Sequence, residues 1–288
     1  MIRKSALAVG LLTAMALVAA ACTPGTGPAP VSWKVRPASI KVLDGEDNDT
    51  GDEPYVIQVG FRSKLGVPES SSVQVASQCR SGQLTPIDAG IDGTTVAIPP
   101  GSADITFGGV QNLDIGDVVL STAPLEILGT ISFAAERDAP FSTCLLTDAF
   151  DQIFSGVLTD ALNLLIADST VPPTQDALVQ LLTDNISSVL SGVFTLLGTI
   201  LEGFGNPDDI VGVAAQILLP TSGAFAGLLD AGLAIGGIFQ PGLETGILPI
   251  DSTGIRIRVG NLQPSSTTFT LENKYIAKYE FTSTVIGG

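Results

Sequence analysis

The spacing of apolar residues divides the chain into two regions with strand-like patterns, separated by a region with helical periodicity. From Trp33 to about Phe141, short apolar runs alternate with Gly, Pro, Asn and Asp, which is typical of strands joined by turns. In the run from Tyr55 to Phe61, apolar side chains occupy every second position, so we expect a strand with one buried face. The strands predicted in this region are 39–43, 55–62, 72–76, 94–98 and 125–133.

Apolar residues recur at a helical spacing from about Ser142. The predicted buried stripe of this first helix comprises Leu146, Phe150, Ile153, Val157, Ala161 and Leu164. A second helix is expected to follow Pro172-Pro173 and to end near Glu202. The run Asn206-Pro207-Asp208-Asp209 has the residues that favour a helix start, so a third helix is predicted from there to Pro220. A fourth is expected over residues 222–239.

The alternating pattern of strands returns after Gly246, at residues 255–259 and 275–281. Antiparallel segments on both sides of a helical region predict an α+β fold: an antiparallel β-sandwich or curled sheet with an inserted bundle of about four apolar helices. The expected boundaries are a β-rich module formed by residues 33–141 plus 250–288, and a helical insertion formed by residues 142–249.

The expected helices are unusually apolar, with no charged residue from Ile210 to Leu229 or from Asn185 to Leu201. Packing against one another to form a core is the common explanation for such helices in a water-soluble domain. Two alternatives stay open. The helices and the sheet enclose a lipid or another apolar ligand, which makes the protein a carrier, or the helices insert into a membrane or form a pore.

The first residues of the chain are typical of an export signal. Arg3 and Lys4 precede an uncharged apolar run that is short for a membrane span, and Ala19-Ala20-Ala21-Cys22 follows. This segment resembles the bacterial lipoprotein signal peptide, in which the cysteine becomes the first mature residue and carries a diacylglycerol on its sulfur. The resemblance implies a signal peptide of residues 1–21 and lipidation of Cys22. The small residues also suit an ordinary secretory peptidase, which would make the protein a secreted one.

The resemblance also implies a location in the cell envelope, on the outer face of the cell membrane or in the outer membrane. Residues 22–32 are rich in Pro and Gly, so we expect an extended tether. Acylation of Cys22 would leave Cys79 and Cys144 as a disulfide pair in an oxidising compartment. The alternative is that these two cysteines are free buried thiols.

Six carboxylates lie within the ten residues from Asp44 to Glu53, and their charges repel one another. A hard divalent cation would relieve this repulsion, and Ca²⁺ accepts about six to eight oxygen ligands in irregular geometry. The spacing does not match a calcium-binding helix-loop-helix, so a solvated turn is the alternative. The predicted cofactor is Ca²⁺, and its predicted ligands are Asp44, Asp47, Asp49, Asp52 and Glu53.

The overall charge and the missing residue types restrict the function. The chain has 13 basic residues, 29 acidic residues and no histidine. Loss of residues 1–21 removes two basic residues, so the mature charge is 11 − 29 = −18. This charge argues against nucleic acid as a partner and against electrostatic attraction to anionic lipid. Without histidine, Ser-His-Asp and Cys-His catalysis and imidazole metal sites are excluded. We therefore expect a non-enzymatic structural or binding module, attached to the membrane by its lipid anchor, whose partner is an envelope protein or an apolar ligand.

Overall fold

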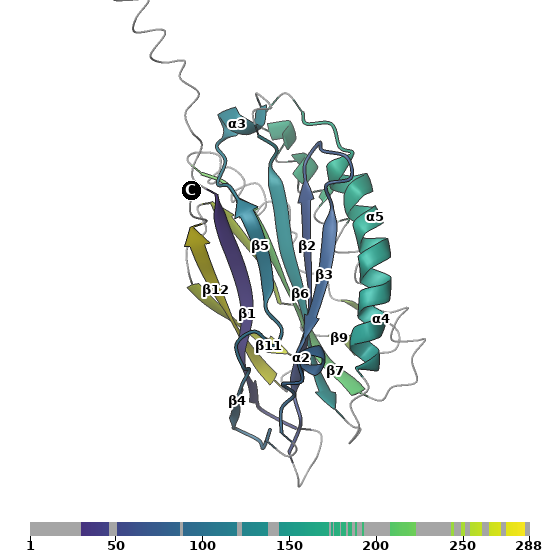
Figure 1. The fold of residues 1–288 in the computed structure, drawn as a ribbon, viewed down its shortest axis with the longest axis vertical. Coiled ribbons are helices and arrows are strands. Elements are labelled where there is room, and N and C mark those ends of the chain that lie inside the picture. The colour runs from purple at the N-terminus through teal and green to yellow at the C-terminus, as the bar shows by residue number, and fades with distance from the viewer. Residues whose placement is uncertain are drawn as a thin grey trace, which may run out of the picture.

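Two β-sheets pack face to face, and a long helix covers the outer face of the second sheet (Figure 1). The computed structural model describes residues 30–45, 51–86, 89–119, 123–137, 144–172, 208–222, 254–260, 265–271 and 275–285, with shorter stretches at 174, 176–178, 180–182, 184–185, 188, 192, 243–244 and 249–250. The α+β fold with a sandwich of mostly antiparallel sheets agrees with the prediction in its β part.

The first sheet contains five strands, in which β1 lies between β12 on one side and β4 and β5 on the other. All of its pairs are antiparallel. The β1–β12 pairing runs from Val31 with Val285 to Val42 with Tyr275, so the two ends of the described chain are neighbours. Its strands are β1 (Val31–Val42), β4 (Thr95–Ala97), β5 (Ile105–Val110), β11 (Ser265–Leu271) and β12 (Tyr275–Val285).

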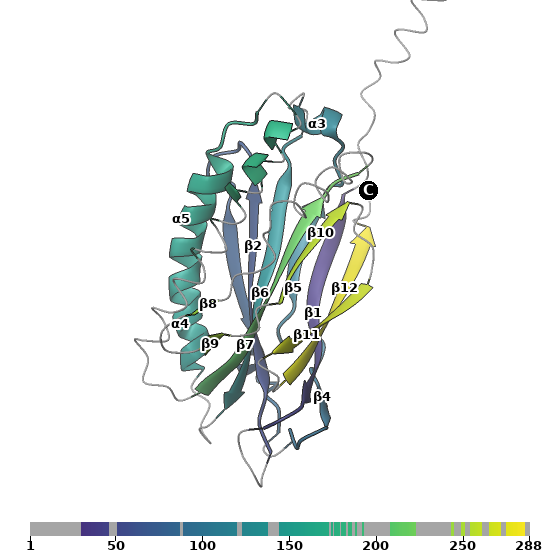
Figure 2. The same cartoon turned by 180° about the vertical axis from the view of Figure 1, so that it is seen from behind.

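The second sheet also contains five strands, in the order β10-β7-β6-β2-β3, and only the β10–β7 pair is parallel (Figure 2). Its strands are β2 (Tyr55–Lys64), β3 (Ser72–Ser77), β6 (Glu126–Arg137), β7 (Asp208–Pro220) and β10 (Gly254–Gly260). The remaining short elements are a small pair, β8 (Leu243–Glu244) with β9 (Pro249–Ile250), and the helices α2 (Gln78–Ser81) and α3 (Ile115–Val119).

The second sheet is the middle layer of the molecule, so it contributes to two hydrophobic cores. Ile57 and Val59 belong to the core between this sheet and the helix, whereas Val56 belongs to the core between the two sheets. The expectation that β2 has only one buried face is therefore wrong. Its polar residue Gln58 is fully buried, where it accepts a hydrogen bond from Ser132 Oγ at 2.8 Å.

The long helix is continuous from α4 (Leu145–Ile153) through a π-helical turn η1 (Phe154–Leu158) and α5 (Thr159–Leu162) to a second π-helical turn η2 (Asn163–Ala167). It is the one described helix that is long and apolar enough to cross a membrane by length and composition, but its apolar stripe packs on the second sheet. The buried stripe recurs every fourth residue, at Leu146, Phe150, Phe154, Leu158, Leu162 and Ile166.

The predicted stripe of this helix is wrong in part, because Val157 and Leu164 are 52% and 72% exposed. In a helix of 3.6 residues per turn, a repeat of four residues drifts by about 40° per step around the axis. The wider π-helical turns offset this drift, so the four-residue stripe stays on the sheet.

The third predicted helix is wrong: Asp208–Pro220 is strand β7, so the region 142–249 is not a purely helical insertion. This strand lies between β6 and β10 in the middle layer, where both of its faces are buried. A strand of that kind has a continuous apolar run without alternation, which resembles a buried helix in sequence.

The described helical residues 176–178, 180–182 and 184–185 fall within the second predicted helix, and nearly all of the fourth predicted helix lies outside the described residues. A bundle of four helices is thus not part of the described structure.

Candidate functional site

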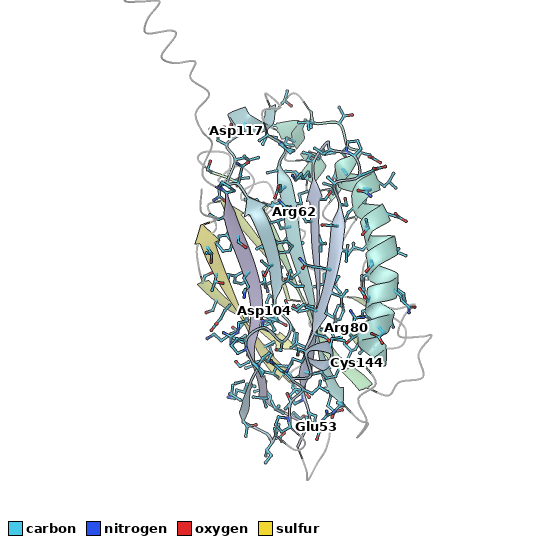
Figure 3. All side chains as sticks on the ribbon, in the orientation of Figure 1. Glu53, Arg62, Arg80, Asp104, Asp117 and Cys144 are labelled. Atoms are coloured by element: carbon cyan, nitrogen blue, oxygen red, sulfur yellow. A yellow bond between two sulfur atoms is a disulfide. The ribbon has the colours of Figure 1, made fainter. Side chains whose placement is uncertain are left out.

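The described residues of the acidic segment, 44–45 and 51–53, lie between the end of β1 and the start of β2, at one end of the sandwich, where Glu53 is labelled in Figure 3. The first residue of β12, Tyr275, and the second-last residue of β6, Glu136, are at the same end. Residues distant in sequence therefore meet the acidic segment here. We call the group of Asp52, Glu53, Glu136 and Tyr275 the acidic cluster.

Asp52 is the residue around which this end of the sandwich is organised. It is fully buried, and its carboxylate Oδ2 accepts a hydrogen bond from the Tyr275 hydroxyl at 2.6 Å. Its backbone pairs with Gly90 in both directions, through N···O distances of 3.2 and 2.9 Å. A Cβ at Gly90 would lie 2.5 Å from the Asp52 carbonyl oxygen, so only glycine permits this approach. The residue thus connects β12 to two loops.

The other two carboxylates of the acidic cluster act on the same hydroxyl. Burial raises the pKa of Tyr275, and so do its hydrogen bond to Asp52 and the negative charges of Asp52, Glu136 and Glu53. Glu53 and Glu136 are themselves buried. Three carboxylates therefore act on one buried hydroxyl at this end of the sandwich.

The structure brings only two of the five predicted calcium ligands into the acidic cluster. Asp52 and Glu53 belong to the acidic cluster, whereas Asp44 is exposed, and Asp47 and Asp49 lie outside the described residues. The backbone N–H of Gly45, next to Asp44, donates to Asp92 Oδ1 at 2.8 Å. Within the described part of the chain, no group of three or more acidic or cysteine side chains is arranged to hold a metal ion.

Sequence reasoning missed Glu136 and Tyr275 as neighbours of the acidic segment. Their contribution depends on strand register, since Tyr275 pairs with Val42 and Ala135 pairs with Tyr55. One signal was available: Glu136 is an acid at the end of a strand whose interior is uncharged from Ile127 to Ala135.

A second polar group fastens the long helix to the edge strand β3. Cys79 in α2 and Cys144, the residue before α4, form a disulfide with their Cα atoms 5.7 Å apart. Next to it lies Arg80, which is labelled with Cys144 in Figure 3. Arg80 forms ion pairs with Asp148 at 2.9 Å and with Asp151 at 3.0 Å. The hydrogen bond to Asp148 raises the pKa of Arg80, although burial acts in the opposite direction. This group attaches the start of the helix layer to the second sheet.

Comparisons with known proteins give no match: no protein-family model matches the chain, and neither do curated proteins or solved structures. The fold itself defines the class as an α+β protein with a mostly antiparallel β-sandwich and a helix layer.

Proposed function

We propose that the protein is an exported, lipid-anchored cell-envelope protein that acts as a non-enzymatic structural or binding module. The observation that carries this proposal is the position of the first strand. Strand β1 begins at Val31, nine residues after Cys22, and the residues between them are rich in Pro and Gly. An extended segment of this length spans roughly 30 Å, so the tether would hold the sandwich close to the membrane that carries the acylated cysteine.

The geometry of the acidic cluster supports a structural role for these carboxylates. A carboxylate that acts as a general acid or a nucleophile must reach a substrate. Asp52 is instead fully buried and bonded to Tyr275, and Glu136 is 1% exposed. The chain also has no histidine that would act with them. These features favour a structural role for the acidic cluster, which joins the strands at this end of the sandwich, over a catalytic role.

Calcium is the stabilising ion that we propose for the acidic segment. The charges of Asp52, Glu53 and Glu136 converge on Tyr275, and Asp47 and Asp49 belong to the same acidic segment. In thermal unfolding of the mature protein, a chelator should lower Tm, and added Ca²⁺ should restore it, whereas Mg²⁺ should restore it less. Equal melting curves with chelator and with Ca²⁺ would remove calcium from the proposal and leave the anchored module intact.

The packing between helix and sheet favours a closed core over the carrier alternative. Phe133 of β6 contacts Phe150 and Phe154 of the helix, with ring centroids 4.6 and 6.1 Å apart, and the two helix rings are 5.5 Å apart. Leu178 and Leu182 extend the same core. Apolar side chains of the protein thus occupy the described space between helix and sheet that a carrier would use for its ligand.

Metabolic labelling tests the lipid anchor directly. The full-length chain, expressed in a bacterium with radiolabelled palmitate, should incorporate the label and partition with membranes. The variant Cys22→Ala should lose the label and move to the soluble fraction. The double variant Cys79→Ser/Cys144→Ser is the matched control, and it should keep the label. Absence of label from the unmodified protein would refute lipidation.

A further inference from the structure

Charge is distributed unevenly between the two outer faces of the layered structure. The long helix carries three acids, Asp148, Asp151 and Asp160, and Asp168 directly follows it. The helix has no base, because the chain has no basic residue between Arg137 and Arg256. The outer face of the first sheet differs. Its described residues include four bases, Lys34, Arg36, Lys41 and Lys278, and two acids, Asp104 and Glu280. We call these four bases and their surroundings the basic face.

Side chains along β1 and β12 alternate between the core and the outer face, and this alternation places the charged residues on the outer face. On β1, Trp33, Val35, Ile40 and Val42 are buried between the sheets, so Lys34, Arg36 and Lys41 lie on the opposite side. On β12, Lys278 lies on the outer side and pairs in register with Ser39, and Glu280 pairs with Arg36. Two adjacent strands thus gather four of the 13 basic residues of the chain on one face.

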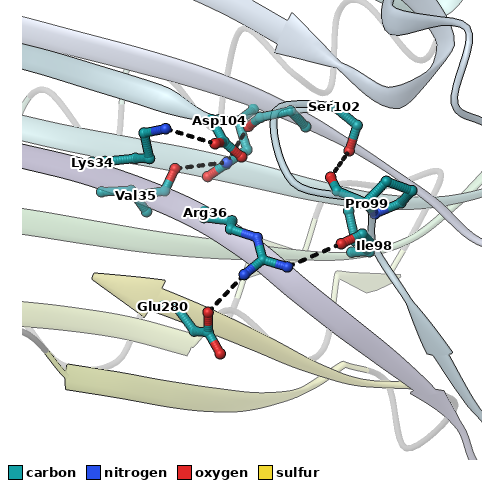
Figure 4. A network of polar contacts seen from close by, with 10 residues as sticks. Lys34, Val35, Arg36, Ile98, Pro99, Ser102, Asp104 and Glu280 are labelled. Atoms are coloured by element: carbon teal, nitrogen blue, oxygen red, sulfur yellow. Dashed lines mark hydrogen bonds and ion pairs between the residues drawn. The ribbon is translucent and has the colours of Figure 1, made fainter. Parts of the chain in front are cut away.

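The contacts on the basic face keep its cations in place and partly exposed (Figure 4). Arg36 Nη1 donates to Glu280 Oε2 at 2.8 Å, and its Nη2 donates to the Ile98 carbonyl at 3.3 Å. Lys34 lies 3.2 Å from Asp104, and Lys278 lies 3.4 Å from Glu280. The Lys34 and Lys278 side chains remain 46% and 42% exposed, so both can contact a further anion.

Hydroxyl groups surround these cations. Thr106 pairs with Lys34 across β1 and β5, and Thr268 pairs with Lys278 across β11 and β12. Other exposed hydroxyl residues on the same face are Thr95, Ser266, Thr270 and Thr282. Hydroxyl and ammonium groups both donate hydrogen bonds, and phosphate oxygens accept several of them. The chemistry of the face therefore fits phosphate-bearing headgroups.

The layers separate this face from the acids of the helix. Packed sheets lie about 10 Å apart, and a helix layer adds a similar distance. The Debye length at physiological ionic strength is about 8 Å, so charges on the helix are largely screened at the outer face of the first sheet. The net charge of the chain, −16, thus does not decide what this face attracts.

We propose that the basic face binds anionic lipid headgroups and orients the domain with its first sheet toward the membrane and its helix layer away from it. This inference rests on the proposed lipid anchor for its location. Strand β1, which carries three of the four cations, is also the strand that follows the tether from Cys22. The anchor on Cys22 would hold the domain at the membrane, and the basic face would determine which side of the domain contacts the headgroups.

Vesicle binding by an unlipidated protein tests the basic face independently of the anchor. The mature chain with Cys22→Ser is sedimented with vesicles of phosphatidylcholine, with or without phosphatidylglycerol, at low and high salt. We expect binding only to the vesicles with phosphatidylglycerol, and loss of that binding at high salt. The variant Lys41→Gln should bind about fivefold more weakly, since a cation near an anionic surface contributes roughly that factor.

Lys64→Gln is the matched control, because Lys64 is a partly exposed cation on the second sheet that pairs with Glu126. Its binding should equal that of the parent protein, and thermal unfolding should show that both variants are folded. Equal binding to both kinds of vesicle, or an equal effect of the two substitutions, would overturn the proposal. Soluble polyphosphate that binds as tightly as the anionic vesicles would also overturn it, since the face would then recognise a polyanion and not a membrane.

Discussion

The two buried tyrosines of β12 predict how folding stability depends on alkaline pH. Burial, the hydrogen bond to Asp52 and nearby carboxylates raise the pKa of Tyr275. Burial raises the pKa of Tyr279 too, although the nearby Ser132 acts in the opposite direction. In the unfolded chain both tyrosines titrate near pH 10. Their contribution to stability is therefore complete below pH 10 and is lost as the pH rises toward the folded pKa values.

The magnitude follows from the number of protons involved. Above pH 10 the folded state holds one more proton than the unfolded state at each tyrosine, and each corresponds to about 1.4 kcal/mol per pH unit. Tyr275 and Tyr279 together should lower the free energy of unfolding by about 2.7 kcal/mol per pH unit.

Urea unfolding at a series of pH values from neutral to alkaline measures this slope. Tyr275→Phe and Tyr279→Phe should each reduce it by about 1.4 kcal/mol per pH unit. At neutral pH the two variants should differ. Tyr275→Phe removes a hydrogen bond to a buried carboxylate and should cost about 1.5–3 kcal/mol, whereas Tyr279→Phe should cost less. A spectroscopic titration in which the folded protein ionises both tyrosines near pH 10, with no change in stability, would refute the reasoning.

Three further predictions concern the second sheet and the helix layer. The double variant Cys79→Ser/Cys144→Ser opens a cross-link of 65 residues and should lose about 4 kcal/mol of unfolding free energy, which reduction of the parent protein should reproduce. Phe154→Ala removes a buried ring and should cost about 3–5 kcal/mol in urea unfolding, while Val157→Ala on the exposed side should change stability by less than about 0.5 kcal/mol. Gly129→Ala would place a Cβ against the ring of the buried Phe61, so Tm should fall by an amount that corresponds to about 1–3 kcal/mol.

Most strands were predictable from their short apolar runs, but the number of buried faces of each strand was not. The predicted strands at 39–43, 55–62, 72–76, 94–98 and 125–133 all overlap strands of the structure. Strand β5 was missed because Ile105 and Phe107 are followed by two glycines, which end the alternation early. Strand β7 was assigned to a helix because its neighbours in the sheet, which the sequence does not specify, bury both of its faces.

The acidic cluster shows the same limit for the candidate site. Asp52 and Glu53 are recognisable because they belong to a dense local run of acids. Tyr275 and Glu136 join them only through the pairing of β12 with β1 and of β6 with β2, which places residues more than eighty positions away beside the acidic segment. The amino-acid composition is therefore enough to find the acidic segment, whereas finding its neighbours Tyr275 and Glu136 requires the register of the strands.

The order of the layers also explains why net charge is a poor guide to the surfaces of this protein. Burial on both faces excludes charge from the interior of a strand. In β2, β6 and β7 of the middle sheet, the charged residues accordingly lie near the strand ends. The charged residues of the helix are all acids, because the chain has no base between Arg137 and Arg256. The bases of the first sheet lie on its outer face because side chains along β1 alternate between the core and that face. The two outer faces therefore differ in sign. The face that contacts a partner must be judged by its own residues, because at physiological salt the opposite face lies beyond about two Debye lengths.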